Sequence, residues 1–126
     1  MEELVTFETA ELAKQKGFNE STIDWFEKRI NGKWEEEYPQ NHDFGYSSYN
    51  TKENTIARPT QAMLQKWLRE EHKIFLNSIT GHDLGTRFQI YYEEDRFTYD
   101  ELYTDMYEKY ELALEAGLKE GIKKIK

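Results

Sequence analysis

Cysteine is absent from the 126 residues of the chain, which excludes disulfide bonds and metal sites built on thiolates. Long apolar runs are absent too, since no stretch approaches the roughly 20 apolar residues of a membrane-spanning helix. Residues 1–5 contain neither the basic nor the apolar segment of a secretory signal. From these absences we expect a cytoplasmic protein that has no membrane partner.

Positive charge is scarce in this chain. Its 17 Lys and Arg residues are outnumbered by 25 Asp and Glu residues, which gives a formal net charge of −8. Such a charge keeps a small protein soluble and repels polyanions, so nucleic acid is a disfavoured partner. An alternative interpretation is that the acidic surface imitates nucleic acid and occupies a basic partner. Net charge alone does not separate this role from ordinary solubility.

Aromatic residues, by contrast, are plentiful at 15% of the chain, while hydrophobic residues overall make up 37%. Each buried aromatic side chain removes roughly 150–250 Å² from water, so a few of them can build a core. The length fits one domain and leaves no room for two ordinary ones. We therefore expect a single domain over residues 1–126.

Two helices are predicted in the first part of the chain. Thr6 can cap a helix over residues 6–16, and Gly17 follows where such a helix would end. Residues 59–72 have an amphipathic pattern, with Pro59 in the first turn. The apolar face of this second helix consists of Met63, Leu64, Trp67 and Leu68.

A third helix is predicted within residues 98–126. Residues 98–101 have the spacing of a capping box. One helix of this length is long for a small domain, so we expect a break near Asp105. Gly117 and Gly121 lie on the apolar face, and each costs about 1 kcal/mol of helix propensity against alanine. Glycine at these positions indicates that the helix backbone lies close against a sheet.

Residues 23–38 carry conflicting signals. Their start resembles a weak helix-capping pair, whereas Asn31-Gly32 is a strong hairpin signal, because a type I′ turn needs positive φ at both central residues. A hairpin folded around that turn would set Arg29 opposite Trp34, a favourable cation–aromatic pair. We prefer the hairpin, and the helix stays open as the alternative.

The remaining segments complete the predicted fold. Residues 73–79 and 86–92 read as two strands of a second hairpin, since the latter alternates apolar and polar residues. Residues 39–58 are polar and without a period, which predicts a long loop. The order helix, hairpin, loop, helix, hairpin, helix predicts an α+β fold, with an antiparallel sheet of two hairpins and helices packed on one face.

Two runs of the sequence are similar to a known group of proteins. Residues 57–72 (ARPTQAMLQKWLREEH) and residues 110–125 (YELALEAGLKEGIKKI), together with residues 4–18, resemble small uncharacterised proteins found in phages and prophages of Bacteroides-type bacteria. The resemblance implies a small accessory protein of a mobile element, and it carries over no catalytic residue. Residues 39–54 and 93–107 depart from the group.

Candidate catalytic residues are few. The three histidines form no HExxH motif, and the glycines form neither a phosphate loop nor a dinucleotide fingerprint. His42 and His82 each precede an aspartate. Together with loop carboxylates they could hold a divalent ion, which leaves a small metal-assisted hydrolase as an alternative function. Aspartate is also common in turns, so we expect no catalytic residue, no cofactor and no bound metal.

The segment 42–50 is the strongest indication of a binding role. It mixes Tyr, Ser, Gly and Asn, a composition typical of adaptable recognition loops. Its aromatic residues either fold back onto the core or form a contact surface. The candidate protein-contact residues are Phe44, Tyr46 and Tyr49, with Trp34 and Tyr38 as supports.

A second aromatic cluster, the tyrosines between residues 91 and 110, is interleaved with acidic residues. Platforms that stack nucleic-acid bases need basic neighbours, so we interpret this cluster as core together with a possible protein-contact surface. The sequence therefore favours a non-enzymatic phage or prophage accessory protein that binds another protein. It does not identify the partner or the oligomeric state.

The charge balance predicts the behaviour of the protein toward nucleic acid. The main basic cluster, residues 119–126, is short and interrupted by Glu120, so counterion release can supply little affinity. We expect no micromolar binding to DNA or RNA near physiological salt. A gel shift that shows salt-dependent binding, and loses it when residues 123–126 are removed, would contradict this expectation.

Overall fold

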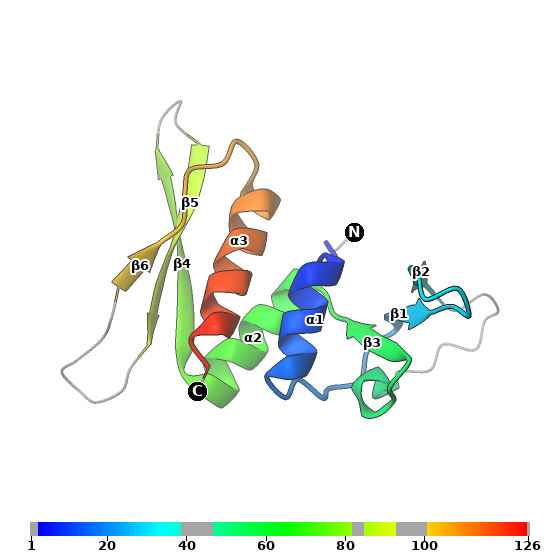
Figure 1. The fold of residues 1–126 in the computed structure, drawn as a ribbon. Helices are drawn as coiled ribbons and strands as arrows, with labels where there is room; N and C mark the ends of the chain where they lie inside the picture. Colours follow the sequence, from blue (N-terminus) through cyan, green and yellow to red (C-terminus); the bar gives the residue numbers. More distant parts are fainter. Residues whose placement is uncertain (1–2, 39–46, 82–84, 93–100, 126) are drawn as a thin grey trace. The chain divides into compact units, whose positions relative to one another are not determined.

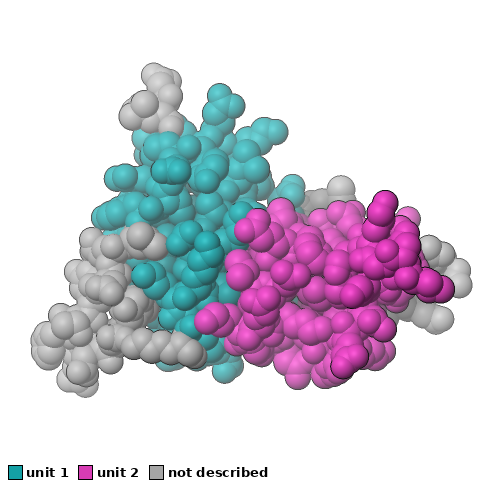
Figure 2. Space-filling view, viewed as in Figure 1, with its two compact units in different colours: residues 1–3, 61–126 teal, residues 4–60 magenta. Residues whose placement is uncertain are grey.

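The computed structural model describes residues 3–38, 47–81, 85–92 and 101–125 (Figure 1). The chain groups into two compact units, coloured separately in Figure 2. Unit 1 comprises residues 1–3 and 61–126, and unit 2 comprises residues 4–60. Each unit combines helix with an antiparallel three-stranded sheet. The α+β class is therefore confirmed, and the single domain over residues 1–126 stays a prediction.

Unit 2 begins with helix α1 (Phe7–Gln15), and both of its ends follow the sequence signals. The Thr6 hydroxyl accepts a hydrogen bond from the backbone N–H of Thr9 at 3.4 Å. At the other end the N–H of Phe18 donates to the Ala13 carbonyl at 2.9 Å, and that of Gly17 donates to the Lys14 carbonyl at 3.1 Å. This pair of bonds is the Schellman motif, which satisfies carbonyls that the helix end leaves open.

The sheet of unit 2 has the strand order β2-β1-β3. Strands β1 (Asp24–Lys28) and β2 (Trp34–Glu37) form the predicted hairpin, so the helical alternative for residues 23–38 is wrong. Strand β3 (Thr55–Arg58) pairs with the other side of β1. The prediction that residues 39–58 form a loop is therefore wrong for residues 55–58, which form this strand. A short 3₁₀ helix, η1 (Tyr49–Thr51), precedes β3.

The register of the hairpin differs by one residue from the prediction. In the turn only Gly32 has a positive φ, at +84°, so the turn is not type I′. The Arg29 N–H donates to the Lys33 carbonyl at 2.8 Å, and the Gly32 N–H donates to the Arg29 carbonyl at 2.9 Å. These bonds close a three-residue loop with a left-handed glycine, the next most common hairpin connection.

The shifted register sets Lys28 opposite Trp34, where the prediction paired Trp34 with Arg29. A shift of one residue moves every side chain of a strand to the other face of the sheet. Trp34 therefore shares a face with Phe26, and both contact Phe7 of α1. The ring centroid of Phe7 lies 5.2 Å from that of Phe26 and 5.6 Å from that of Trp34. This face is the core side of the sheet in unit 2.

Unit 1 is built on the sheet β4-β5-β6, with helices α2 and α3 packed on one face (Figure 1). The strands are β4 (Ile74–Gly81), β5 (Gly85–Tyr92) and β6 (Glu101–Tyr103). The side chains beneath the helices are buried: Ile74, Leu76, Phe88 and Ile90. The second predicted hairpin is thus present, but the two hairpins belong to different sheets and do not share one.

Helix α2 (Gln61–His72) starts two residues later than predicted. The reason is that Pro59 follows strand β3, and its carbonyl accepts a hydrogen bond from the Val5 N–H at 3.1 Å. The predicted apolar face is largely confirmed, since Leu64, Trp67 and Leu68 are buried and Met63 is half-buried.

The C-terminal segment differs most from its prediction. Residues 101–103 form strand β6 along β5, and helix α3 begins at Tyr110 and ends at Lys123. The predicted helix start over residues 98–101 is wrong at Glu101, because pairing with β5 outweighs the local capping pattern. Thr98 lies outside the described residues.

The close approach of α3 to the sheet is confirmed. A Cβ atom added to Gly117 would lie 3.1 Å from the Cβ of Phe88 on β5. A Cβ atom added to Gly121 would lie 3.2 Å from Leu68 Cδ1 and 3.3 Å from Ile74 Cγ2. The two glycines therefore allow the helix backbone to rest on the sheet and on α2.

We expect Gly117→Ala to destabilise the protein by about 1 kcal/mol. Alanine gains about 1 kcal/mol of helix propensity, but it pushes against the Phe88 Cβ, which is attached directly to the strand backbone, and overpacking costs about 1–3 kcal/mol. Urea unfolding of the variant measures the change. Gly121→Ala is the matched control, because its neighbours are methyl groups that can move, and its loss should be smaller. A Gly117→Ala variant as stable as the wild type would contradict the tight packing.

Candidate functional site

The face of the unit 1 sheet opposite the helices carries a group of aromatic side chains. We call it the outer sheet face and define it by six of its residues, Phe75, Ile79, Arg87, Gln89, Tyr91 and Tyr103; the register also sets Asn77 and Glu101 on this side of the sheet. These residues alternate along their strands with the buried ones, so they point away from α2 and α3. Figure 1 shows the two helices on the other side of the sheet.

The rings of the outer sheet face are ordered by contacts with each other. Phe75 and Tyr91 stack across β4 and β5, with centroids 5.3 Å apart and planes at 16°. The Arg87 guanidinium lies over the Tyr103 ring, 4.6 Å from its centroid. Tyr103 remains 43% exposed. Pre-ordered aromatic side chains bind with a smaller entropy loss than mobile ones.

The chemistry of this face suits recognition. Among the six residues that define it only Arg87 is charged, and tyrosine and arginine are enriched in the few residues that dominate the affinity of protein interfaces. The side chains named here therefore combine apolar rings with one cation, which suits contact with a partner surface.

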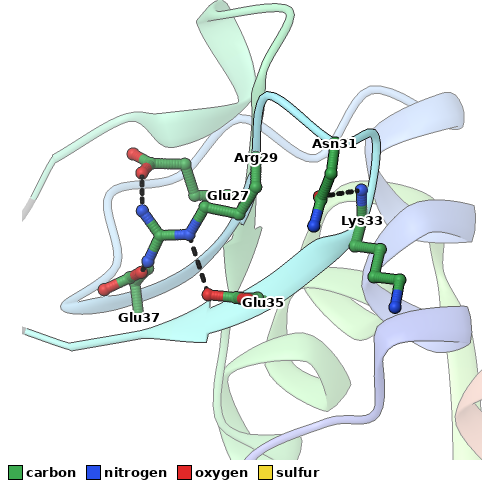
Figure 3. Close-up of polar contacts among 6 residues, drawn as sticks. All are labelled: Glu27, Arg29, Asn31, Lys33, Glu35 and Glu37. Carbon is green, nitrogen blue, oxygen red and sulfur yellow. Dashed lines mark hydrogen bonds and ion pairs between the residues drawn. The ribbon is translucent and has the colours of Figure 1, made fainter.

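A second polar site lies in the hairpin of unit 2 (Figure 3). We call it the Arg29 cluster, and it consists of Arg29, Glu27, Glu35 and Glu37. The guanidinium contacts Glu27 at 3.1 Å and Glu35 at 2.8 Å, and its remaining terminal nitrogen pairs with Glu37. The register places these odd-numbered residues on one face of the hairpin, opposite the face of Phe26 and Trp34.

The Arg29 cluster lies beside an open concavity of about 540 Å³, lined by residues 27–31. Glu27 and Glu35 are direct cross-strand partners, and like charges in such positions are destabilising. Arg29 lies between them and offsets this repulsion. All the carboxylates of the cluster are paired with one cation, so the arrangement stabilises the register of the hairpin.

The described residues show no group of three or more potential ligands that could hold a metal ion. His42 and His82, the candidates for a metal-assisted hydrolase, lie outside the described residues. Within the described ranges no helix is long and apolar enough to cross a membrane.

Tyr49, one of the predicted contact residues, is half-buried in unit 2. Its ring stacks on Trp25 with centroids 4.5 Å apart and planes at 14°. Burial raises the pKa of Tyr49, and the nearby charge of Asp24 raises it further. Burial also raises the pKa of Asp24, while the positive charge of Arg58 lowers it in part. Tyr49 thus packs on an aromatic side chain of strand β1, on the face opposite Phe26 and Trp34.

The other predicted contact residues are not brought together in the described part of the chain. Trp34 packs on Phe7, whereas Tyr38 is 63% exposed. Phe44 and Tyr46 lie outside the described residues. The contact loop as a whole stays a prediction.

The outer sheet face was only partly visible in the sequence. The tyrosine cluster from residue 91 onward pointed to Tyr91 and Tyr103, but Phe75 and Arg87 were missed as members of the same surface. The alternation of Arg87, Gln89 and Tyr91 along one strand was the available signal. Their pairing with Phe75 and Tyr103 depends on a register that no local pattern specifies.

Comparisons of the chain with protein-family models, with curated proteins and with solved structures give no match.

We expect Arg29→Gln to destabilise the hairpin of unit 2 by about 0.5–1 kcal/mol at low salt, because the carboxylates of the cluster would then repel each other with no cation between them. The effect is small because Arg29 is 39% exposed, and ion pairs in solvent contribute about 0–1 kcal/mol. Urea unfolding measures the loss, which should shrink at high salt as screening increases.

Lys33→Gln is the matched control for this prediction, because it removes the same charge from the same hairpin outside the cluster. Adding Glu35→Gln to Arg29→Gln should restore part of the lost stability. Equal losses for the Arg29 and Lys33 variants would show that the cluster has no stabilising role.

Proposed function

We propose that the protein is a non-enzymatic accessory protein of a phage or prophage, and that it binds another protein through the outer sheet face. The observation that carries this proposal is the ordered set of aromatic side chains on the side of the β4-β5-β6 sheet that α2 and α3 leave uncovered. Protein-binding surfaces commonly combine such rings with arginine at their centre.

Protein is favoured over nucleic acid as the partner because of charge. The net charge of −8 repels a phosphate backbone, and Arg87 is the single cation among the six described residues that define the outer sheet face. A stacking platform for bases needs several cations to hold the phosphates. A protein partner needs none, since ring packing and hydrogen bonds can supply the affinity.

The assignment to a mobile element rests on the resemblance of residues 57–72 and 110–125 to small phage and prophage proteins. Both runs lie mainly in the helices α2 and α3, which support the sheet from its other side. These two runs lie mainly in the scaffold of unit 1, whereas the third run, residues 4–18, lies in unit 2 and includes α1. The proposed contact lies on the opposite face of the unit 1 scaffold.

The test is capture of partner proteins from a lysate of a Bacteroides-type host, with the immobilised full chain and mass spectrometry. The variant Arg87→Ala with Tyr103→Ala removes the cation and the exposed ring of the outer sheet face. We expect its affinity for the captured protein to fall at least tenfold, the equivalent of about 1.4 kcal/mol.

The matched control is Leu112→Ala, which removes an exposed apolar side chain, 54% accessible, from helix α3. It should capture the partner as the wild type does, and urea unfolding should show that all variants remain folded. Capture that survives the double substitution would reject the outer sheet face as the contact surface. Loss of capture on Tyr38→Ser alone would instead favour the predicted loop surface.

A further inference from the structure

Strand β4 is an unprotected edge of the sheet in unit 1. The order β4-β5-β6 gives it a neighbour on one side only. Its eight residues, IFLNSITG, contain no proline and no charged residue, although charged residues make up 33% of the chain. Edge strands are usually protected from further pairing by charge, proline, a bulge or short length. Strand β4 carries no charge and no proline, and it is not short.

The hydrogen-bond pattern shows which residues of β4 direct their backbone groups outward. On β5, Thr86 exchanges backbone hydrogen bonds with Tyr107, and the Phe88 carbonyl accepts from the Thr104 N–H at 2.9 Å. The even-numbered residues of β5 therefore bond away from β4, and the odd-numbered ones bond toward it. In this register even-numbered residues of β4 lie opposite even-numbered residues of β5. The even-numbered residues of β4 therefore direct their N–H and carbonyl groups to the open side.

Among the described residues, a hydrogen bond reaches the open side only near the start of the strand. The Leu76 carbonyl accepts a hydrogen bond from the Gln65 side chain of α2 at 3.4 Å. Ser78 and Thr80 are exposed, and in the described ranges no backbone hydrogen bond reaches them from the open side. Each therefore presents one N–H and one carbonyl to an incoming strand.

We propose that a second copy of the chain pairs antiparallel with β4, with the two-fold axis at Ile79. In this register Ser78 of one copy lies opposite Thr80 of the other, and the reverse holds by symmetry. Each pair exchanges two backbone hydrogen bonds, so all four open groups of each copy are satisfied. The two Ile79 side chains meet at the axis in a non-hydrogen-bonded pair, where side chains approach most closely.

Self-complementarity favours a second copy over an unrelated strand. A two-fold axis places the same segment on both sides of the contact, and a segment without charge can meet itself without like-charge repulsion. Serine opposite threonine adds a favourable cross-strand hydrogen bond. The pairing also joins the outer sheet faces of the two copies into one continuous surface. This inference does not depend on the proposed function.

Charge outside the strand sets the conditions for pairing. Two copies that each carry a net charge of −8 repel each other, and added salt screens that repulsion. We therefore expect a dimer that strengthens with salt, in contrast to contacts between opposite charges, which salt weakens.

The test is sedimentation equilibrium of the full chain from about 1 μM to about 1 mM, at about 0.05 M and 0.5 M NaCl, where the screening length differs severalfold. We expect dimer formation that rises with concentration and is tighter at the higher salt. Ile79→Lys, which sets two cations against each other at the axis, should weaken it at least tenfold. Gln89→Lys places the same charge on the same face of the central strand β5 and should dimerise as the wild type does.

A second variant and a second measurement keep the test decisive if Ile79→Lys disturbs folding. Ser78→Pro removes only an outward N–H, because edge strands tolerate proline on their open side, and it should also abolish the dimer. In amide exchange, Ser78 and Thr80 should become slower as the protein concentration rises. A chain that stays monomeric at every concentration and salt, or a dimer that survives both variants, would overturn the proposal.

Discussion

The close contact between helix α3 and strand β5 is the constraint on which unit 1 depends. Gly117 brings the helix backbone against Phe88, and the neighbouring Leu114, Leu118 and Ile122 are buried. Once one face of the sheet is buried in this way, the alternation of β-strands assigns every remaining side chain to the other face. The position of the aromatic residues on the outer sheet face is therefore a consequence of the packing beneath it. The buried Gln61 side chain strengthens the same arrangement, because it donates to Glu115 at 3.0 Å and to the Glu111 carbonyl at 2.9 Å.

In unit 2 the corresponding constraint is the turn at Gly32. Its positive φ closes a three-residue loop and so sets the register of β1 against β2. That register places Phe26 and Trp34 on the side of Phe7, and it gathers the Arg29 cluster on the opposite side. The same register therefore determines both the aromatic core contacts and the Arg29 cluster. The ion pairs add little stability of their own in solvent, but they remove the repulsion that this register would otherwise create between Glu27 and Glu35.

The two surfaces differ in what they can contribute to function. In the Arg29 cluster the guanidinium is already paired with three carboxylates, so its donors serve the hairpin itself. The rings of the outer sheet face contact one another without being covered by α2 or α3, and they combine apolar area with polar tips. Desolvating such rings on binding yields affinity, whereas a partner that approached the Arg29 cluster would have to compete with existing ion pairs. This difference favours the outer sheet face as the place of recognition.

The amino-acid sequence by itself determined the features that depend on neighbouring residues. Thr6 and Gly17 delimit α1, the glycine spacing marks the buried face of α3, and the alternation around Phe88 and Ile90 marks β5, because caps, helical faces and strand faces repeat over a few residues. Tertiary structure decided the rest. Strands β3 and β6 are short and exist because β1 and β5 supply their hydrogen-bond partners. The one-residue change of register at the hairpin, and the division into two sheets, depend on pairing between residues distant in the chain, which no local pattern encodes.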